Sequence, residues 1–423
     1  MSAGEDAMNF VSSVRTEPGA TPALKVFRGG THRVQRPVET VDRMRRFMAV
    51  MGITRIANIT GLDRIGIPVT AVCRPNSRSV AVAQGKGIDL PAAEASGLME
   101  AIESYHAERI TLPLKYATYE ELRYTHDVVD LDSLPTSTNS RFHPDLPILW
   151  IEGYDLISKR FVWLPFETVH TNYTYPMPPG SGCFYASSNG LASGNHVLEA
   201  ISHAICEVVE RDSTTLWRSL GDVSGIDRRI RLESVTEPDC RELLDKLESA
   251  DIAVAIWETT SDVGIPSFAS WIVERGNNCP VLKQPTVGFG CHPTRAVALS
   301  RAVTEAAQDR LTVITGSRDD LRRKVYEPVS EALARAQEAV FAVRPARDFE
   351  DGPSKESEAL NEDVRWELDR LQRAGIREVV VVDLTKSEFS IPVVRVVIPG
   401  LEGPDGADYV PGRRAQALAD RRR

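Results

Sequence analysis

Hydrophobic and polar positions follow a two-residue period in some segments of the chain and a helical period in others. The strand-like pattern is found at residues 80–84, 148–153, 161–164, 252–259, 268–274, 378–383 and 393–398. The helical pattern is found at residues 91–108, 195–216, 294–315 and 360–374. No repeat of fixed period is visible. This mixture predicts an α/β (α+β) protein in which helices flank mixed sheets.

The two ends of the chain differ in composition from the middle. Residues 1–20 are polar and small, which predicts a disordered N-terminus. Residues 405–423 are rich in Gly, Asp and Arg, which predicts a flexible basic C-terminal tail. Between the ends, the polar segment 344–358 is the best candidate for an internal loop. We therefore expect one folded domain over residues 21–404.

Composition and charge exclude several classes of protein. The chain has 423 residues, with 50 Lys and Arg against 59 Asp and Glu, a formal net charge of −9. A general nucleic-acid binder needs a basic surface, so we expect no nucleic acid as partner. No apolar run reaches the ~18 residues of a transmembrane helix, and no signal-peptide pattern is present. Six cysteines without a CxxC pair fit a reducing compartment, so we expect a cytoplasmic protein without a membrane partner.

Two of the predicted helices gather acidic residues on one face. Ser96, Glu100 and Glu103 fall within a sector of roughly 60° on the helix at 91–108, opposite an apolar side. The helix at 195–216 has a broader polar side, with apolar residues on the other. Its polar side carries Asn195, Glu199, Glu207, Glu210 and Arg211, and Asn195 is a candidate N-cap.

The acidic faces lack the lysine partners that support most solvated helix faces. A solvated face remains the ordinary interpretation of either helix alone. Clustered carboxylates repel one another, however, unless a cation lies among them. Mg²⁺ prefers oxygen ligands and bridges to phosphates, so two such helices face to face could hold Mg²⁺ and a nucleoside triphosphate. There is no Walker loop, so this would be a non-Walker ATP site between acidic helices.

A third helix face is weaker evidence for a phosphate site. It carries Arg301, Glu305 and Gln308, followed by Arg310. Arginine and glutamine donors near a metal would bind phosphate oxygens or orient a substrate.

These motifs together resemble the YcaO family, ATP-dependent enzymes that activate backbone amides of peptides. The similar blocks are QGKGIDLPAAEASGLMEAIESYHAERI (84–110), SSNGLASGNHVLEAISHAICEVVERDS (187–213) and RAVTEAAQDRLTVITGSRDD (301–320). The segments FRGGTHRVQRPVET (27–40) and IPVVRVVIPGLEG (391–403) are similar as well. The resemblance implies a YcaO-type fold over residues 21–404, ATP and Mg²⁺ as cofactors, and a homodimer.

The resemblance also implies roles for residues that match the family's motifs. It implies metal binding by Glu100, Glu103, Glu199, Glu207 and Glu210. It implies contact with ATP by Thr31, Arg33, Thr40, Ser96, Asn195, Glu199, Arg211, Gln308 and Arg310. The family's chemistry phosphorylates the amide oxygen and needs no nucleophile from the protein. Cys206 and His203 in the second block are accordingly interpreted as packing or locally hydrogen-bonded residues.

Within the family, the nucleophile that adds to the amide determines the product. A Cys, Ser or Thr side chain of the substrate gives an azoline, and external sulfide gives a thioamide. The chain ends in AQALADRRR, without the Pro-rich tail usual in azoline-forming members. TGLDRIGIPV (60–69) and RPNSRS (74–79) resemble the subgroup that works beside a TfuA-type protein. We expect thioamide formation on a peptide or protein substrate, with a sulfide donor and a TfuA-like partner.

Three alternatives remain open at this point. The chain could form azolines or amidines, which the mass of the product distinguishes from thioamides. It could be a non-catalytic accessory factor, for example for ribosomal protein methylthiolation, which an ATPase measurement would test. It could also be a purely structural α/β protein, whose thermal stability Mg²⁺–ATP would leave unchanged.

Overall fold

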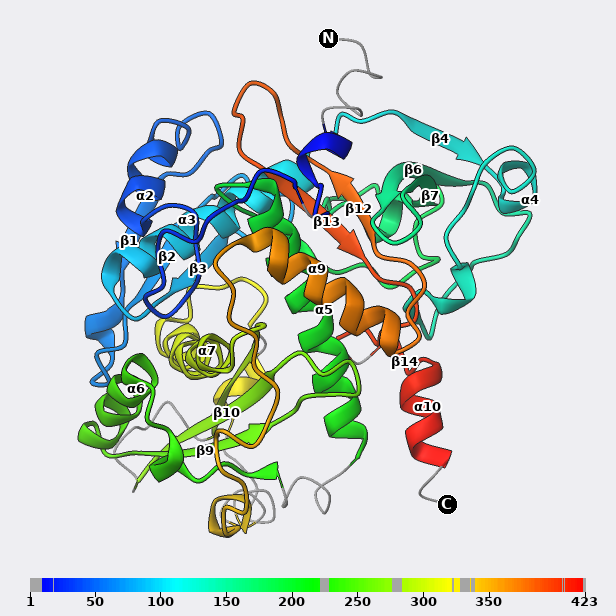
Figure 1. Ribbon diagram of the computed structural model, residues 1–423. Helices are drawn as coiled ribbons and strands as arrows, with labels where there is room; N and C mark the ends of the chain where they lie inside the picture. The colour runs from blue at the N-terminus through cyan, green and yellow to red at the C-terminus, as the bar shows by residue number, and fades with distance from the viewer. Residues whose placement is uncertain are drawn as a thin grey trace.

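The computed structural model describes residues 10–17, 19–220, 228–275, 284–321, 323–327, 335, 339–404, 406 and 408–420. Four long helices dominate Figure 1: α3 Leu90–Ala107, α5 Val197–Ser219, α7 Arg295–Thr315 and α9 Leu360–Arg373. Shorter helices are α2 Pro37–Arg45, α4 Tyr119–Leu122, α6 Pro238–Ser249 and α10 Arg413–Asp420. Among these described helices, none has the length and apolar character needed to cross a membrane.

The described strands form antiparallel sheets of different size. One three-stranded sheet joins β1 Arg55–Asn58, β2 Val69–Cys73 and β3 Val82–Lys86. A second joins β9 Ile252–Glu258, β10 Ser267–Glu274 and β11 Thr286–Cys291. The largest sheet has the order β4 Leu114–Ala117, β6 Ile148–Asp155, β12 Val380–Asp383, β13 Val393–Val397 and β8 Leu191–Ser193, with β7 Arg160–Pro165 also paired to β6. The predicted mixture of sheets and flanking helices is confirmed.

The central strands of the largest sheet are buried on both faces. Val380 and Val382 of β12 pack in one core with residues of α3, whereas Val381 packs in a second core with α5 and α9. A strand covered on both sides is apolar at nearly every position. This explains the apolar run that the sequence shows at 379–382 and the segment 393–398, which only Arg395 interrupts.

Glycines bring two sheets unusually close to two helices. A Cβ on Gly85 of β3 would lie 2.0 Å from the carbonyl oxygen of Ala93 in α3. A Cβ on Gly288 of β11 would lie 2.1 Å from the carbonyl oxygen of Ala302 in α7. Only glycine allows these backbones to approach so closely. The packing sets the positions of α3 and α7, which carry two of the three polar helix faces.

Both chain ends depart from the expected disorder where the structure describes them. Phe10 and Val14 are buried in the core of α5 and α9, although residues 1–9 and 18 lie outside the described part. The expectation of a flexible tail at 405–423 is corrected for its described residues. There, β14 Tyr409–Val410 pairs with β5 Thr136–Ser137, and α10 contacts α5. A few buried apolar side chains and specific ion pairs hold these segments against the domain, although most of their residues are polar.

The internal loop is found as predicted. Residues 344–358 contain neither a helix nor a strand, and Phe349 fixes the loop by packing into the core beside β10 and α7.

Candidate functional site

The acidic faces of α3 and α5 converge in the structure. Together with burial, the charges of Glu100 and Glu207 raise the pKa of Glu103 on α3, and the charge of Glu210 raises the pKa of Glu207 on α5. Burial raises the pKa of Glu103 to about 8, and the neighbouring carboxylates add to this effect. Burial also raises the pKa of Glu207 to about 7, against the opposing effect of Arg211. The four glutamates therefore form one group of carboxylates, and their burial makes each of them harder to ionise than a glutamate in water.

This carboxylate group fits a cation held together with phosphates. Oε2 of Glu210 is buried and has no hydrogen-bond partner within the described part of the chain, and Oε1 lies 3.3 Å from Nη1 of Arg211. Among the described residues, no three Asp, Glu, His or Cys side chains are placed to cage a metal ion by themselves. Mg²⁺ does not need such a cage, because it keeps several waters and combines one or two carboxylates with phosphate oxygens.

Basic side chains from other elements complete the site. Lys86 of β3 forms an ion pair and a hydrogen bond with Oε2 of Glu305 in α7. Burial alone would raise the pKa of Glu305, but Lys86 and Arg211 outweigh it and lower the pKa. Glu100 interacts with the charges of Arg318 and Lys86. The elements α3, α5, α7 and β3 thus contribute to a single site with carboxylates and cations side by side.

Lys86 and Glu305 had no predicted role from the sequence alone. The signal was available, because Gly85-Lys86-Gly87 stands between a strand and a helix and Glu305 shares a face with Arg301 and Gln308. Only the packing of α7 beside β3 shows that the two residues meet.

The N-terminal segment is attached to the start of α5. The backbone N–H of Val34 donates to Oε2 of Glu199 at 2.9 Å, and Nε of Arg33 lies 3.7 Å from Oε1 of Glu199. Thr40 and Arg43 both donate to Oδ1 of Asn195, at 3.2 and 2.8 Å. Arg33, Thr40, Asn195 and Glu199 are therefore brought together at the start of α5, and Arg43 joins them; their contact with ATP stays a prediction.

The structure differs from the sequence analysis at the beginning of α5. The N-cap is His196, whose Nδ1 accepts from the backbone N–H of Leu198 at 3.2 Å, and not Asn195. Nδ2 of Asn195 instead donates to Oε1 of Glu199 at 3.4 Å. Both oxygens of Glu199 accept protein hydrogen bonds, so its contacts in the structure position the N-terminal segment.

The remaining predicted residues lie around this group with different contacts. Ser96 and Thr31 are half-buried, and Ser96 lies one turn before Glu100 on α3. Nε2 of Gln308 donates to the backbone oxygen of Gln84 at 2.8 Å and joins α7 to β3. Near Glu103, both the N–H and the hydroxyl of Ser193 donate to its Oε1 at 2.8 Å.

Arg310 is the one predicted ATP-contacting residue that the structure places elsewhere. Its Nε donates to Asp63 at 2.7 Å and its Nη2 donates to Glu274 at 2.6 Å, in a buried ion-pair group. Residues two apart on a helix face nearly opposite sides, so Arg310 cannot share the face of Gln308. The expectation of phosphate contact by Arg310 is corrected to a structural role between α7, β10 and the 60–63 turn.

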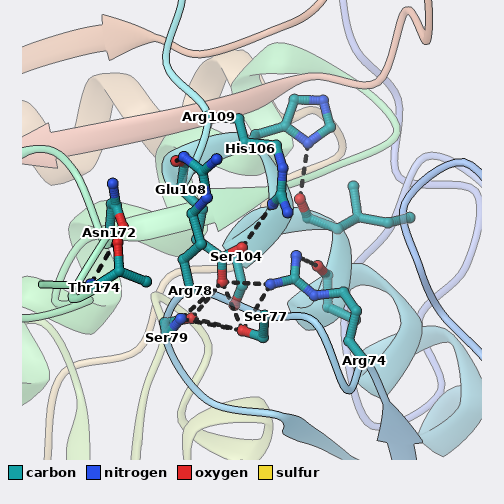
Figure 2. A network of polar contacts seen from close by, with 12 residues as sticks. Arg74, Ser77, Arg78, Ser79, Ser104, His106, Glu108, Arg109, Asn172 and Thr174 are labelled. Atoms are coloured by element: carbon teal, nitrogen blue, oxygen red, sulfur yellow. Dashed lines mark hydrogen bonds and ion pairs between the residues drawn. The ribbon is translucent and has the colours of Figure 1, made fainter.

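A buried polar network fixes the end of α3. Figure 2 shows Glu108 surrounded by donors from the turn at 74–79. Its Oε1 accepts from the hydroxyls of Ser77 and Ser79 at 2.7 and 2.6 Å and from Arg74, and its Oε2 accepts from Arg109 at 2.7 Å. Burial alone would raise the pKa of Glu108, but these donors outweigh it and lower the pKa. The RPNSRS segment therefore anchors the helix that carries Glu100 and Glu103.

The sequence is similar to those of known proteins over most of its length. A family model described as "YcaO cyclodehydratase, ATP- and Mg²⁺-binding" matches residues 84–402. An uncharacterized protein in the tfuA 3′ region of Rhizobium leguminosarum bv. trifolii is 35% identical over 388 residues, which cover 89% of this chain and 90% of that protein.

Comparisons with solved structures agree on the fold. YcaO from Methanopyrus kandleri bound with AMPPCP and Mg²⁺ superposes with a TM-score of 0.72 at 23% identity, over 91% of this chain and 99% of that one. A heterocyclase in complex with substrate and cofactor superposes with a TM-score of 0.72 at 24% identity, over 92% of this chain. This chain spans 56% of that heterocyclase.

Proposed function

The chain belongs to the YcaO family, and from this premise we propose that it activates a peptide backbone amide by ATP-dependent phosphorylation for post-translational modification. ATP and Mg²⁺ are the cofactors. The observation that carries the proposal is the convergence of half-buried and buried glutamates from α3 and α5 beside Arg211 and Lys86. A purely structural protein gains nothing from buried carboxylates that raise each other's pKa.

We assign the binding roles from the geometry of the site. Glu100, Glu103, Glu207 and Glu210 would hold Mg²⁺, and Arg211 and Lys86 would balance phosphate charge. When bound, ATP supplies the phosphoryl group and Mg²⁺ neutralises the charge that develops on it. Glu199 and Asn195 hold the N-terminal segment against the site through Val34, Arg33 and Thr40.

The protein's contribution to the reaction is placement and charge. A nucleophile adds to the amide carbon, the amide oxygen becomes attached to phosphate, and that oxygen leaves together with phosphate. Amide oxygen is a poor leaving group until it is phosphorylated. None of these steps requires a nucleophile from the chain, which agrees with the burial of Cys206 in the core.

We further propose that the product is a thioamide, made with a TfuA-like partner and a sulfide donor. Support comes from the relative in the tfuA 3′ region and from the segments at 60–69 and 74–79 that resemble the TfuA-associated subgroup. The proposed substrate is a peptide or protein, and the proposed assembly is a cytoplasmic homodimer.

The decisive experiment combines the protein, its TfuA-like partner, Mg²⁺–ATP, sulfide and a candidate peptide, with mass spectrometry of the peptide. Exchange of one oxygen for sulfur is expected. Loss of one water would identify an azoline-forming enzyme instead. A protein that neither changes the peptide nor hydrolyses ATP would contradict the enzymatic proposal and favour an accessory role.

A further inference from the structure

A polar hollow beside Glu207 contains a buried arginine with few partners. Arg395 of β13 is 3% exposed, and its Nη2 donates to the backbone oxygen of Ser187 at 2.8 Å. Its Nε and Nη1 are buried and have no hydrogen-bond partner in the described part of the protein. Burying donors of a charged group without acceptors is costly. A buried guanidinium with two unpaired donors indicates that a bound ligand supplies the missing hydrogen-bond acceptors.

The walls of the hollow carry further buried polar atoms without partners. Polar and apolar side chains both line the hollow, and the polar ones include Arg395, Ser187, Asn189, Thr168 and Tyr185. Oδ1 of Asn189 is buried and accepts no hydrogen bond from the described residues. The hollow therefore offers an unused acceptor as well as unused donors.

His170 adds a second donor beside the arginine. Its Nδ1 accepts from the backbone N–H of Asn172 at 3.1 Å, so the ring proton is on Nε2, which is buried without a described partner. Burial, together with the smaller effect of the charge of Arg395, lowers the pKa of His170 to about 4. The ring is therefore neutral at pH 7 and donates through Nε2.

The hollow adjoins the proposed metal site. The positive charge of Arg395 favours the ionised form of Glu207, which places the two side chains within electrostatic reach. Burial lowers the pKa of Arg395 to about 10, so it stays charged at neutral pH. A ligand in the hollow would lie next to the phosphoryl group that Glu207 helps to hold.

The mixture of donors and acceptors decides which ligand fits. A triphosphate offers only acceptors and would face the unpaired oxygen of Asn189 unfavourably. A peptide backbone offers carbonyl oxygens and N–H groups together. We propose that this hollow binds the backbone of the substrate peptide next to the modified amide, with Arg395 donating to peptide carbonyl oxygens and Asn189 accepting from a peptide N–H. This inference rests on the proposed function and assigns the peptide side of the same site.

The probe for the test is N-acetyl-trialanine N-methylamide, which has a peptide backbone without charged ends or reactive side chains. Its affinity is measured by saturation-transfer NMR, with and without saturating Mg²⁺–AMPPCP. Arg395→Met is expected to weaken tripeptide binding about tenfold, as for loss of a charge-assisted hydrogen bond. Asn189→Ala should weaken it as well and, because it removes no charge, should leave the affinity for Mg²⁺–AMPPCP nearly unchanged in calorimetry.

The matched control is Arg370→Met, which shortens an arginine on α9 that donates to the backbone oxygen of Val263; it should bind the tripeptide like the wild type. Thermal unfolding verifies that each variant is folded. The inference is overturned if the wild type shows no saturation transfer or if Arg395→Met binds the tripeptide normally. It is also overturned if Arg395→Met loses nucleotide affinity alone. A wild type that ignores Mg²⁺–AMPPCP but binds the tripeptide would refute the proposed function and leave the peptide site standing.

Discussion

Glu103 and Glu207 show how strongly the fold alters ordinary side chains. The ordinary pKa of a glutamate is 4.5, whereas burial raises the pKa values of these two to about 8 and about 7. Keeping such groups ionised at neutral pH costs folding free energy, because the unfolded chain loses their protons more easily. The cost is understandable at a site that binds a cation, since Mg²⁺ requires the ionised form.

The first prediction concerns one of these glutamates. Glu207→Gln keeps the size of the side chain but removes its charge, so we expect Mg²⁺–AMPPCP to bind at least about tenfold more weakly, which is ~1.4 kcal/mol. Isothermal calorimetry measures the affinity. Glu362→Gln, an exposed residue in the first turn of α9, is the matched control and should bind normally. Equal affinity in the two variants would contradict the assignment of Glu207.

The second prediction concerns Glu108 and pH. Its pKa is lowered in the fold from the ordinary value of 4.5, so its stabilising effect is present above that value and is lost as pH falls through the lower folded pKa. Glu108→Gln leaves the buried Arg74 without its charged partner and should cost about 3 kcal/mol at pH 7. Denaturant unfolding should show that the difference from the wild type shrinks below pH 4.5.

The control for Glu108 is a surface ion pair. Glu120 lies 2.9 Å from Arg123 with 36% of its side chain exposed, so Glu120→Gln should cost less than about 1 kcal/mol. A constant difference between Glu108→Gln and the wild type from pH 7 to pH 3 would show that the charge of Glu108 does not stabilise the fold.

At the scale of elements, helices carry the charges and strands decide how close those helices come. Gly85 and Gly288 let β3 approach α3 and β11 approach α7 at backbone distance. Because Lys86 follows Gly85 directly and Glu305 lies on α7, this packing brings the Lys86–Glu305 pair together. The glycines in these strands are therefore part of the construction of the site.

The third prediction tests this packing. In Gly288→Ala the new Cβ would lie 2.1 Å from the oxygen of Ala302 and 2.2 Å from the nitrogen of Ala306, both backbone atoms of α7. Relieving this overlap must shift α7, so we expect a loss of about 1–3 kcal/mol of stability and weaker nucleotide binding. Gly61→Ala is the control, because its Cβ would meet nothing within 4 Å. Thermal unfolding with the same stability for both variants would disprove the argument.

At the scale of the whole molecule, the two chain ends close over the central helix α5. Arg414 of α10 donates to Asp212 at 2.9 and 3.0 Å and also pairs with Asp262. Asp212 is buried and follows Arg211, a residue of the proposed phosphate site. The C-terminal helix therefore supports α5 directly behind the site, as Figure 1 shows in its placement of α10 beside α5.

The fourth prediction concerns this support. Arg414→Ala leaves the buried carboxylate of Asp212 uncompensated and should destabilise the protein by about 3 kcal/mol. The double variant Arg414→Ala with Asp212→Asn should recover part of that loss, because the unpaired charge is gone. Arg413→Ala, at an exposed neighbouring position, should change little. Chemical denaturation of the wild type, Arg414→Ala, Asp212→Asn and the double variant gives the coupling energy, and additive effects would argue against the pairing.

The periodic elements and the acidic faces of α3 and α5 could be predicted from the amino-acid sequence. These depend on local spacing: an amphipathic helix or an apolar strand places its side chains by its own period. The helices at 91–108 and 294–315 and the strands at 252–259 and 268–274 are present within one or two residues of their predicted ends. Family motifs then pointed to ATP and Mg²⁺ before any contact was known.

Which charged side chains form pairs became clear from the three-dimensional packing. Arg310 and Gln308 are two residues apart in sequence, but one pairs with Asp63 and the other with β3. Lys86 and Glu305 are 219 positions apart and form an ion pair, and the ordered C-terminal helix depends on the pairing of Arg414 with Asp212. Such pairings depend on the desolvation of the side chains and on how closely distant segments approach each other. Neither can be read from the local spacing of residues in the sequence.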